Sequence, residues 1–345
     1  MKEIRKIAKE RMKGYCRVCP VCDGRACAGE VPGMGGLGTG SSFIANVQAL
    51  TARRLNMRLI HDAAEPDTRI QFLGKDLALP VLAAPIGGVS FNMGGEISEE
   101  DYIDAVLGGC RDHGTLGCTG DGAPDFIHET GFSAIRALNG AGIPFIKPWE
   151  EPELYHKLEK AEGAGADTVG IDIDAAGLVT LRLMGRPVSP KPPERLREIL
   201  ENTSLKCILK GIMTPDEARL AVDGGAAAIV VSNHGGRVLD GAPGVADALP
   251  AVAGAVKGQI AILADGGVRS GVDILKMLAL GADAVMIGRP FSVAAVGGLR
   301  EGVKKYLEGI ASELVQAMIL TGCKDVASVS RGVLFDPAAG KDETR

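Results

Sequence analysis

The loop at residues 232–237 reads Ser-Asn-His-Gly-Gly-Arg and places a histidine three residues before an arginine. A histidine titrates near neutral pH, so His234 could act as a general base. The planar guanidinium of Arg237 could bind a carboxylate through two parallel hydrogen bonds. Asp174 could orient His234 and stabilise its charged form. Each of the three side chains could instead have a structural role, and the residues alone leave that open.

Two glycine-rich segments have the composition of a phosphate site. Residues 265–269 read Asp-Gly-Gly-Val-Arg, and residues 288–290 read Gly-Arg-Pro. Glycines let backbone N–H groups approach phosphate oxygens, and arginines add charge and directional donors. We therefore expect a phosphate site made of Asp265, Gly266, Gly267, Val268, Arg269, Gly288 and Arg289.

Eight short apolar runs should be the strands that position these residues. They are rich in Val, Ile, Leu and Ala with little polar alternation, which is typical of strands buried on both faces of a parallel sheet. The runs cover residues 80–84, 115–118, 143–147, 168–173, 206–210, 227–232, 261–264 and 283–287. Helical patterns fill the gaps, with starts near Ser98, Thr214 and Ser270. Eight such units predict an α/β fold of the (β/α)8 TIM-barrel type, and a doubly wound open sheet is the alternative.

The carboxyl ends of the strands should carry the site, because barrels of this kind place their sites there. Pro85, Ile86 and Gly87 follow the first predicted strand, Lys147 ends the third, and Lys210 ends the fifth. Lys210 could stabilise negative charge on a ligand such as a reduced flavin ring. A salt bridge with Asp172 or Asp174 is its alternative role.

The chain has 345 residues, 48 glycines and a net charge of −5, which argues against a nucleic-acid partner. No apolar run approaches the length of a membrane span. We expect residues 1–78 to be an N-terminal extension covering one barrel end, 79–331 to be the barrel, and 332–345 to be a loose tail. Because no secretory signal is visible, we expect a cytoplasmic protein.

These residues, in this order, resemble the FMN-dependent 2-hydroxy-acid oxidase and dehydrogenase family, which includes glycolate oxidase and lactate oxidase. The most specific match is residues 232–243, and the similarity runs from about residue 36 to 331. The resemblance implies FMN with its phosphate at the two glycine-rich segments. It also implies further flavin contacts from Pro85, Ile86, Gly87, Lys147, Lys210 and Ser232.

The resemblance further implies the reaction. His234 would take a proton from a small L-2-hydroxy acid such as lactate or glycolate while a hydride or its equivalent passes to the flavin, giving the 2-keto acid. Asp174 would support His234, and Arg237 would anchor the substrate carboxylate. The electron acceptor would be oxygen or a redox partner, and a homo-oligomer is the family expectation.

The chain departs from the family pattern on the substrate side. Residues 31–35 lack the substrate-binding tyrosine expected there. Trp149 stands where a second tyrosine is expected, Lys147 where a flavin-contacting glutamine is expected, and Asp172 where a threonine is expected. Arg182 or Arg186, on a shortened loop after the fourth strand, could still reach the site.

Four cysteines lie outside the family pattern, at Cys16, Cys19, Cys22 and Cys27. Four thiolates in a dozen residues could bind an iron–sulfur cluster or zinc. The C-x2-C-x2-C start resembles ferredoxin spacing, although no Cys-Pro ends it. Redox-active or structural cysteines are the competing interpretations.

Two other hypotheses compete with the hydroxy-acid oxidoreductase. One is another flavin-barrel enzyme, either a reductase or an isomerase such as the type 2 isopentenyl diphosphate isomerase, and the missing tyrosines favour it. The other is a non-catalytic flavin-binding or metal-binding protein. The intact stretch from His234 to Arg237 favours the oxidoreductase.

Overall fold

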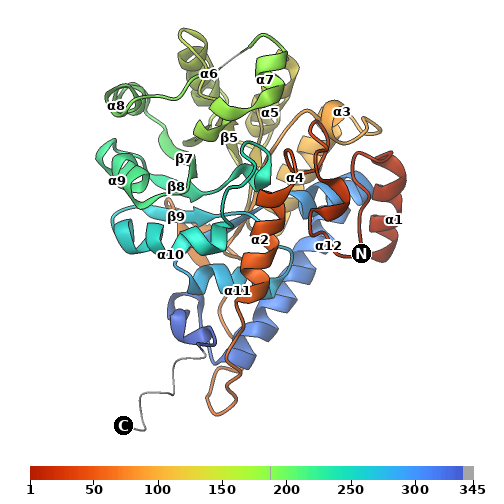
Figure 1. The fold of residues 1–345 in the computed structure, drawn as a ribbon, viewed down its shortest axis with the longest axis vertical. Helices are drawn as coiled ribbons and strands as arrows, with labels where there is room; N and C mark the ends of the chain where they lie inside the picture. The colour runs from red at the N-terminus through yellow and green to blue at the C-terminus, as the bar shows by residue number, and fades with distance from the viewer. Residues whose placement is uncertain (187, 337–345) are drawn as a thin grey trace.

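Eight parallel strands close into a barrel in the computed structural model, which describes residues 1–186 and 188–336. The strands follow one another around the barrel in chain order, and the last pairs with the first. Figure 1 shows the strands with helices arranged around them. The strands of the barrel are listed here in chain order. They are β3 (Val81–Ile86), β4 (Leu116–Thr119), β5 (Ile143–Ile146), β6 (Thr168–Asp172), β7 (Lys206–Ile212), β8 (Ala228–Val231), β9 (Ala261–Ala264) and β10 (Ala284–Ile287). All eight predicted strands are confirmed to within two residues, so the structure is a (β/α)8 barrel and the open sheet is excluded.

Helices cover the outside of the barrel, and two short ones, Val89–Asn92 and Val179–Leu183, lie at its carboxyl end. They are α3 (Val89–Asn92), α4 (Glu99–Asp112), α5 (Asp125–Ala137), α6 (Glu153–Gly163), α7 (Val179–Leu183), α8 (Pro193–Glu201), α9 (Pro215–Asp223), α10 (Val245–Val256), α11 (Gly271–Ala279) and α12 (Arg289–Thr321). Ser270 and Asp273 form a capping box at the start of α11, and Ser98 caps α4. Thr214 precedes α9 as predicted, but its side chain makes no capping bond there.

Apolar side chains fill the barrel interior, and a short hairpin closes its amino end. The hairpin strands are β1 (Ile70–Phe72) and β2 (Lys75–Leu77). Phe72 and Leu77 pack in the same buried cluster as Leu82 and Ile208 from the barrel strands. Burial of these side chains away from water stabilises the closed end.

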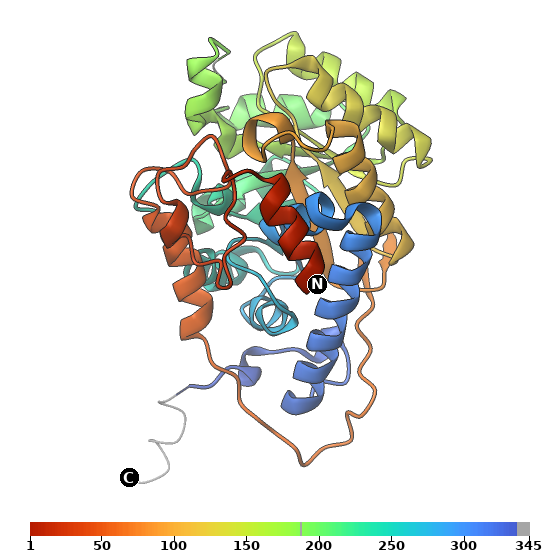
Figure 2. The ribbon, with the colours of Figure 1, turned by 90° about the vertical axis from the view of Figure 1, so that its right-hand side faces the viewer.

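The N-terminal extension contributes to both ends of the barrel. Its helix α1 (Lys2–Arg11) packs beside α12, where Arg11 donates to the carbonyl of Val296 at 2.8 Å (Figure 2). The following segment reaches the carboxyl end, where the amide of Leu37 donates to the carbonyl of Gly236, and leads into α2 (Ser41–Ala52). Because the β1–β2 hairpin covers the opposite end, the extension does more than cover the single end expected.

The C-terminal segment is attached as far as it is described. The amides of Asn56 and Phe335 donate to the carbonyls of Val333 and Arg54, each at 2.8 Å. The expectation of a loose tail from residue 332 is therefore wrong for its first residues, and the part from 337 to 345 lies outside the described residues.

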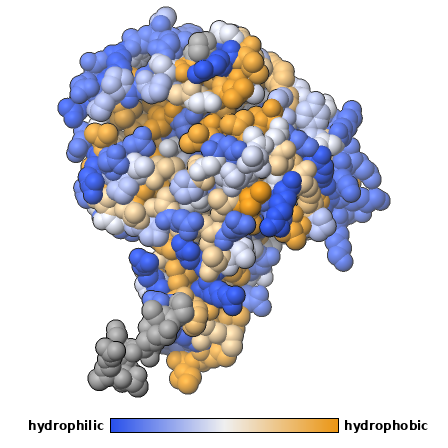
Figure 3. All heavy atoms as spheres, viewed as in Figure 1, coloured by the Kyte–Doolittle hydropathy of each residue, from blue (hydrophilic) through white to orange (hydrophobic). Residues whose placement is uncertain are grey.

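A projection beside this attachment carries exposed apolar side chains, visible at the bottom of Figure 3. The segment between α2 and β1 includes the exposed residues Met57, Leu59 and Ile60. Within the described chain, no helix combines the length and apolar character needed to cross a bilayer.

Candidate functional site

A cavity of about 520 Å³ opens at the carboxyl end of the barrel strands. Its volume lies in the range of about 300–1,000 Å³ that is typical of small-molecule sites. Most of the predicted site residues line it, namely Pro85, Ile86, Gly87, Lys147, Lys210, His234, Arg237, Asp265, Gly266, Gly267, Val268, Arg269, Gly288 and Arg289. Asp174 and Ser232 are not among the lining residues, and both instead contact His234.

His234 is held by two neighbours. Its Nδ1 lies 2.9 Å from the Asp174 carboxylate, and its backbone amide donates to the Ser232 hydroxyl at 3.0 Å. Ser232 in turn donates to Asp265 at 2.8 Å. Since Nδ1 faces Asp174, the other ring nitrogen, Nε2, is left to meet a ligand in the cavity. This is the arrangement of a histidine oriented for proton transfer.

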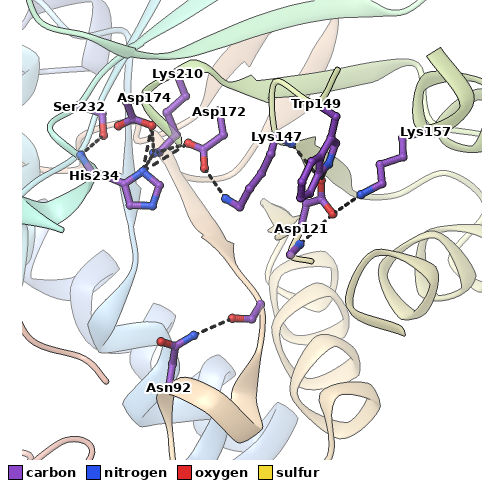
Figure 4. A network of polar contacts seen from close by, with 12 residues as sticks. Asn92, Asp121, Lys147, Trp149, Lys157, Asp172, Asp174, Lys210, Ser232 and His234 are labelled. Carbon is purple, nitrogen blue, oxygen red and sulfur yellow. Dashed lines mark hydrogen bonds and ion pairs between the residues drawn. The ribbon is translucent and has the colours of Figure 1, made fainter. Parts of the chain in front are cut away.

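A row of alternating charges extends from His234 across three strand ends (Figure 4). Asp172 accepts from Lys210 at 2.8 Å and from Lys147 at 3.1 Å. Burial opposes the ionisation of Asp172, but Lys210, His234 and Lys147 outweigh it and hold its pKa well below the usual range. Burial also acts to lower the pKa of Lys210, and the carboxylates of Asp172 and Asp174 raise it. Both partners are therefore charged at neutral pH.

This row accounts for two departures from the family pattern. Lys147 and Asp172 stand where a glutamine and a threonine were expected, and each is the other's ion-pair partner. The added positive charge is thus balanced by an added negative charge.

Asp121 is a buried site residue that sequence reasoning missed. Its carboxylate accepts from the indole of Trp149 at 2.6 Å, from Lys157 at 2.8 Å and from the backbone amide of Lys147 at 3.0 Å. Although burial opposes ionisation, His128 and Lys157 keep the pKa of Asp121 below its usual range. The feature of the sequence that could have indicated Asp121 is its position in the loop directly after β4.

Trp149 does not take the place of a substrate-facing tyrosine. Its side chain is 2% exposed and does not line the cavity. Lys157 and Arg186 lie against its ring, at 4.3 and 5.0 Å from the centroid. Trp149 instead supports Asp121 from behind, and Asp121 reaches the cavity wall.

The loop after β6 brings apolar side chains to the cavity rather than the arginines that were expected. Leu178, Leu181 and Met184 line it, and neither Arg182 nor Arg186 does. Arg186 pairs with Glu153 at 2.6 Å instead.

The loops after β9 and β10 form a cationic cradle. Gly266 and Gly267 have φ of 77° and 87°, and an added Cβ at Gly267 would lie 2.6 Å from the backbone of Asn46. Only glycine fits there, because the loop packs directly against the backbone of α2. The Arg269 Nε is buried without a hydrogen-bond partner in the described structure. Arg289 lies over the Phe43 ring at 3.8 Å, and burial together with Arg237 and Arg269 lowers its pKa to about 9.

The cradle fits a dianionic phosphate such as that of FMN. Its half-buried guanidiniums contact carbonyl oxygens and a thiol rather than carboxylates, for example Arg289 to Met34 at 2.7 Å. A phosphate would supply the balancing charge and the missing acceptor for Arg269.

Arg237 lies beside the cradle, in contact with the N-terminal extension, and shares the Gly35 carbonyl with Arg289 as an acceptor. Its guanidinium donates to the carbonyl of Gly33 and to the side-chain oxygen of Asn92. Burial lowers the pKa of Arg237 to about 10, so it is charged at neutral pH. Tyr15, Pro32 and Met34 line the cavity from the same extension.

Tyr15 thus brings a tyrosine to the cavity from well before residues 31–35. The local sequence around Tyr15 does not indicate this position, because it results from the chain folding back on itself. The amide of Met34 donates to the carbonyl of Tyr15 at 3.1 Å.

The four N-terminal cysteines are free and partly exposed. Burial raises the pKa of Cys16 and Cys27, and the Cys22 thiol raises both further. Among the described residues, the one set of three potential metal ligands within 4.8 Å of one another is Asp172, Asp174 and His234. No three of the four sulfur atoms approach one another that closely.

Comparison with known proteins identifies the family. The model of the FMN-dependent dehydrogenase family matches residues 33–187 and 182–336. Over 345 aligned positions the chain is 32% identical to 4-hydroxymandelate oxidase of Amycolatopsis orientalis, covering 86% of this chain and 90% of that protein. It is 49% identical over 143 residues to an L-lactate dehydrogenase of Pseudomonas aeruginosa (strain LESB58), an alignment that covers 41% of this chain and 37% of that protein.

Solved structures agree with the sequence matches. Mandelate oxidase with benzoyl-formic acid has a TM-score of 0.78 at 30% identity, with 97% of each chain covered. A mandelate oxidase variant with a C4a-OH-FMN adduct has a TM-score of 0.74 at 29% identity, covering 96% of this chain and 97% of that one. The chain therefore belongs to the FMN-dependent dehydrogenase family and is an FMN-dependent oxidoreductase of 2-hydroxy acids.

Proposed function

We propose that the protein oxidises a small L-2-hydroxy acid to the corresponding 2-keto acid, with His234 as the base. The observation that carries this proposal is the pairing of His234 with Asp174 at 2.9 Å on a cavity that also holds the half-buried cation of Arg237. A base and a carboxylate anchor on one cavity are what a 2-hydroxy acid requires.

FMN would supply the two-electron acceptor for this oxidation. Its phosphate would be held by the cradle, that is by Gly266, Gly267, Arg269, Gly288 and Arg289. Asp265 and Val268, in the loop after β9, would complete the cofactor-binding set. The ring would lie along Pro85, Ile86 and Gly87, with Lys147, Lys210 and Ser232 as polar neighbours. The charge of Lys210 would stabilise negative charge on the ring system.

The chain's own residues would then handle the substrate. Arg237 would exchange its contact with the Gly33 carbonyl for the substrate carboxylate, a stronger charge-assisted partner. The free Nε2 of His234 would accept a proton, and Asp174 would stabilise the resulting imidazolium.

The apolar side chains on the cavity wall support a substrate with an apolar side chain. Phe91, Ile127, Leu178, Leu181 and Met184 all line the cavity. Lactate is the smallest such acid, and a relative that acts on 4-hydroxymandelate supports including aromatic acids in a substrate panel. We further expect oxygen or a redox partner as electron acceptor, a homo-oligomeric assembly and a cytoplasmic location.

Anaerobic stopped-flow spectroscopy of the FMN-loaded protein tests the proposal. Glycolate, L-lactate and L-mandelate would each be mixed with the oxidised enzyme while flavin absorbance is recorded. We expect at least one acid to bleach the flavin. His234→Ala should slow that step by about 10²–10⁴-fold, which is the usual contribution of a general base.

Arg237→Lys should raise the substrate concentration needed for half-maximal reduction by about ten- to a hundredfold, because a point charge replaces a two-pronged donor. The matched control is His156→Ala, since His156 lies exposed on α6, away from the cavity. Bound FMN that no hydroxy acid reduces would overturn the proposal.

A further inference from the structure

Four thiols gather beside the cationic cradle. Cys16, Cys19 and Cys22 lie between α1 and the short helix η1 (Arg25–Cys27), and Cys27 ends η1. All four are free and partly exposed, whereas Cys110, Cys118, Cys207 and Cys323 are buried. Nothing in the proposed oxidation uses these thiols.

Hydrogen-bond donors lie against two of these sulfur atoms. The backbone amide of Val18 donates to the Cys16 sulfur at 3.4 Å, and Arg269 donates to the Cys22 sulfur at 3.5 Å. The segment is also held in place, because Arg5 donates to the carbonyl of Cys19 at 2.6 Å.

The separation of the sulfur atoms distinguishes the two metal candidates. In a tetrahedral zinc site, Zn–S bonds of about 2.3 Å place the sulfurs about 3.8 Å apart. In the part of the chain that the structure describes, no three cysteine sulfurs lie within 4.8 Å of one another. A [4Fe–4S] cluster spreads its ligands farther apart because each thiolate binds a different iron. The C-x2-C-x2-C spacing of residues 16–22 is also that of cluster-binding ferredoxins.

We propose that Cys16, Cys19, Cys22 and Cys27 bind a [4Fe–4S] cluster at the phosphate end of the flavin cavity. Arg269 connects the two sites, since it lines the cavity and also donates to Cys22.

The position next to the cavity gives the cluster a role, and this role rests on the proposed function. Oxidation of one hydroxy acid releases two electrons and two protons, and the flavin accepts both electrons. A cluster in the 2+ state accepts one electron at a time, becomes 1+, and returns to 2+ by passing that electron to an external one-electron acceptor. Two such cycles reoxidise one flavin, and the protons leave to solvent.

The test begins with metal analysis of the full-length FMN protein, purified without oxygen and reconstituted with ferrous iron and sulfide. We expect about four irons and four acid-labile sulfides per chain, and an electron paramagnetic resonance signal after dithionite reduction. Cys19→Ser and Cys22→Ser should lower iron and sulfide to background while FMN remains bound. The matched control is Cys323→Ser, because this cysteine is buried at the far end of α12.

Three results would overturn the cluster. These are one zinc per chain without sulfide, cysteines that form disulfides and hold no metal, and iron content that Cys19→Ser leaves unchanged. The role of the cluster in passing electrons from the flavin is tested separately. A hydroxy acid that bleaches the flavin is added first, and ferricyanide is then added as the external one-electron acceptor. Slower ferricyanide reduction in Cys19→Ser, at an unchanged rate of flavin bleaching, is expected.

The two proposals fail in distinguishable ways. A dithionite-induced cluster signal without bleaching by any hydroxy acid would leave the metal site standing and remove the proposed substrate class. Flavin bleaching by a hydroxy acid in a protein that binds no iron would support the proposed substrate class and remove the metal site.

Discussion

Single residues explain how the site departs from its family pattern without losing its charge balance. Asp172 lies between Lys147 and Lys210, with both ammonium groups in hydrogen-bond range. An unpaired buried lysine would be costly, so the lysine at 147 requires the aspartate at 172. We interpret the two unusual residues as one coupled change.

A double-mutant cycle tests this coupling. Asp172→Thr leaves two buried lysines without their shared partner and should cost about 3–5 kcal/mol of unfolding free energy. Lys147→Gln should cost less, because Asp172 keeps Lys210. The double variant should be more stable than the sum of the two single changes predicts, by about 0.5–3 kcal/mol.

Urea unfolding at neutral pH measures the cycle. The control is Lys257→Gln, whose partner Asp283 is exposed, and it should change stability by less than about 1 kcal/mol. Strict additivity of the two site variants would contradict the coupling.

The same carboxylate predicts a pH dependence. The pKa of Asp172 is lower in the folded protein than in the unfolded chain, whose aspartates titrate near about 3.9. The unfolded chain therefore binds the proton more readily, and the stabilisation is complete above about pH 4 and is lost as the pH falls toward the lower, folded value.

Asp172→Asn removes this carboxylate while keeping the shape of the side chain. The stability difference between wild type and variant should be largest at neutral pH and should shrink below about pH 4. Urea unfolding at several pH values measures it, and a difference that does not vary with pH would refute the assignment.

At the scale of elements, the loop after β8 is positioned by its contact with α2. Gly236 has φ of 79°, and an added Cβ would lie 2.4 Å from the backbone nitrogen of Phe43. Asn233 and Asn46 are joined by hydrogen bonds at 2.8 and 3.1 Å across the same contact. The helix from the extension thus helps to hold the loop that carries His234.

Gly236→Ala should therefore destabilise the protein more than Gly241→Ala. Gly241 has a similar φ of 84°, but an added Cβ there meets nothing within 4 Å. Both variants carry backbone strain of about 1–3 kcal/mol, and only Gly236→Ala adds an overpacking cost of about 1–3 kcal/mol. Thermal or urea unfolding of the pair measures the difference, and equal losses would mean that the contact with α2 is not tight.

At the scale of the whole molecule, the N-terminal extension completes the cavity that the barrel begins. Arg289 donates to the carbonyls of Met34 and Gly35, and Arg237 donates to that of Gly33. A ligand that engages these arginines must therefore act on the extension as well as on the barrel.

FMN binding should stabilise the whole chain and the extension in particular. At a concentration one hundred times its dissociation constant, a ligand adds about 2.7 kcal/mol to the free energy of unfolding. Hydrogen exchange should slow at the amides of Gly29, Met34 and Leu37, which are hydrogen-bonded within or to the extension. The β1–β2 hairpin at the opposite end is the internal control. Slower hydrogen exchange at the hairpin without slower exchange at these three amides would contradict a cavity formed jointly by the barrel and the extension.

Much of the fold could be predicted from the sequence because its determinants are local. Each buried strand is a short apolar run, and eight runs separated by helical patterns predict a closed barrel. The strand-end rule then placed Lys210, His234 and Arg269 at one end of the barrel, and the structure brings them to one cavity.

Only the tertiary structure decided which side chains face each other across that cavity. The pairing of Lys147 with Asp172, the inward turn of Trp149 onto Asp121, and the arrival of Tyr15 from the extension all depend on contacts between distant segments. Sequence periodicity reports which face of an element is buried. It does not report the partner on the other side, because that choice is made by packing between elements far apart in the chain.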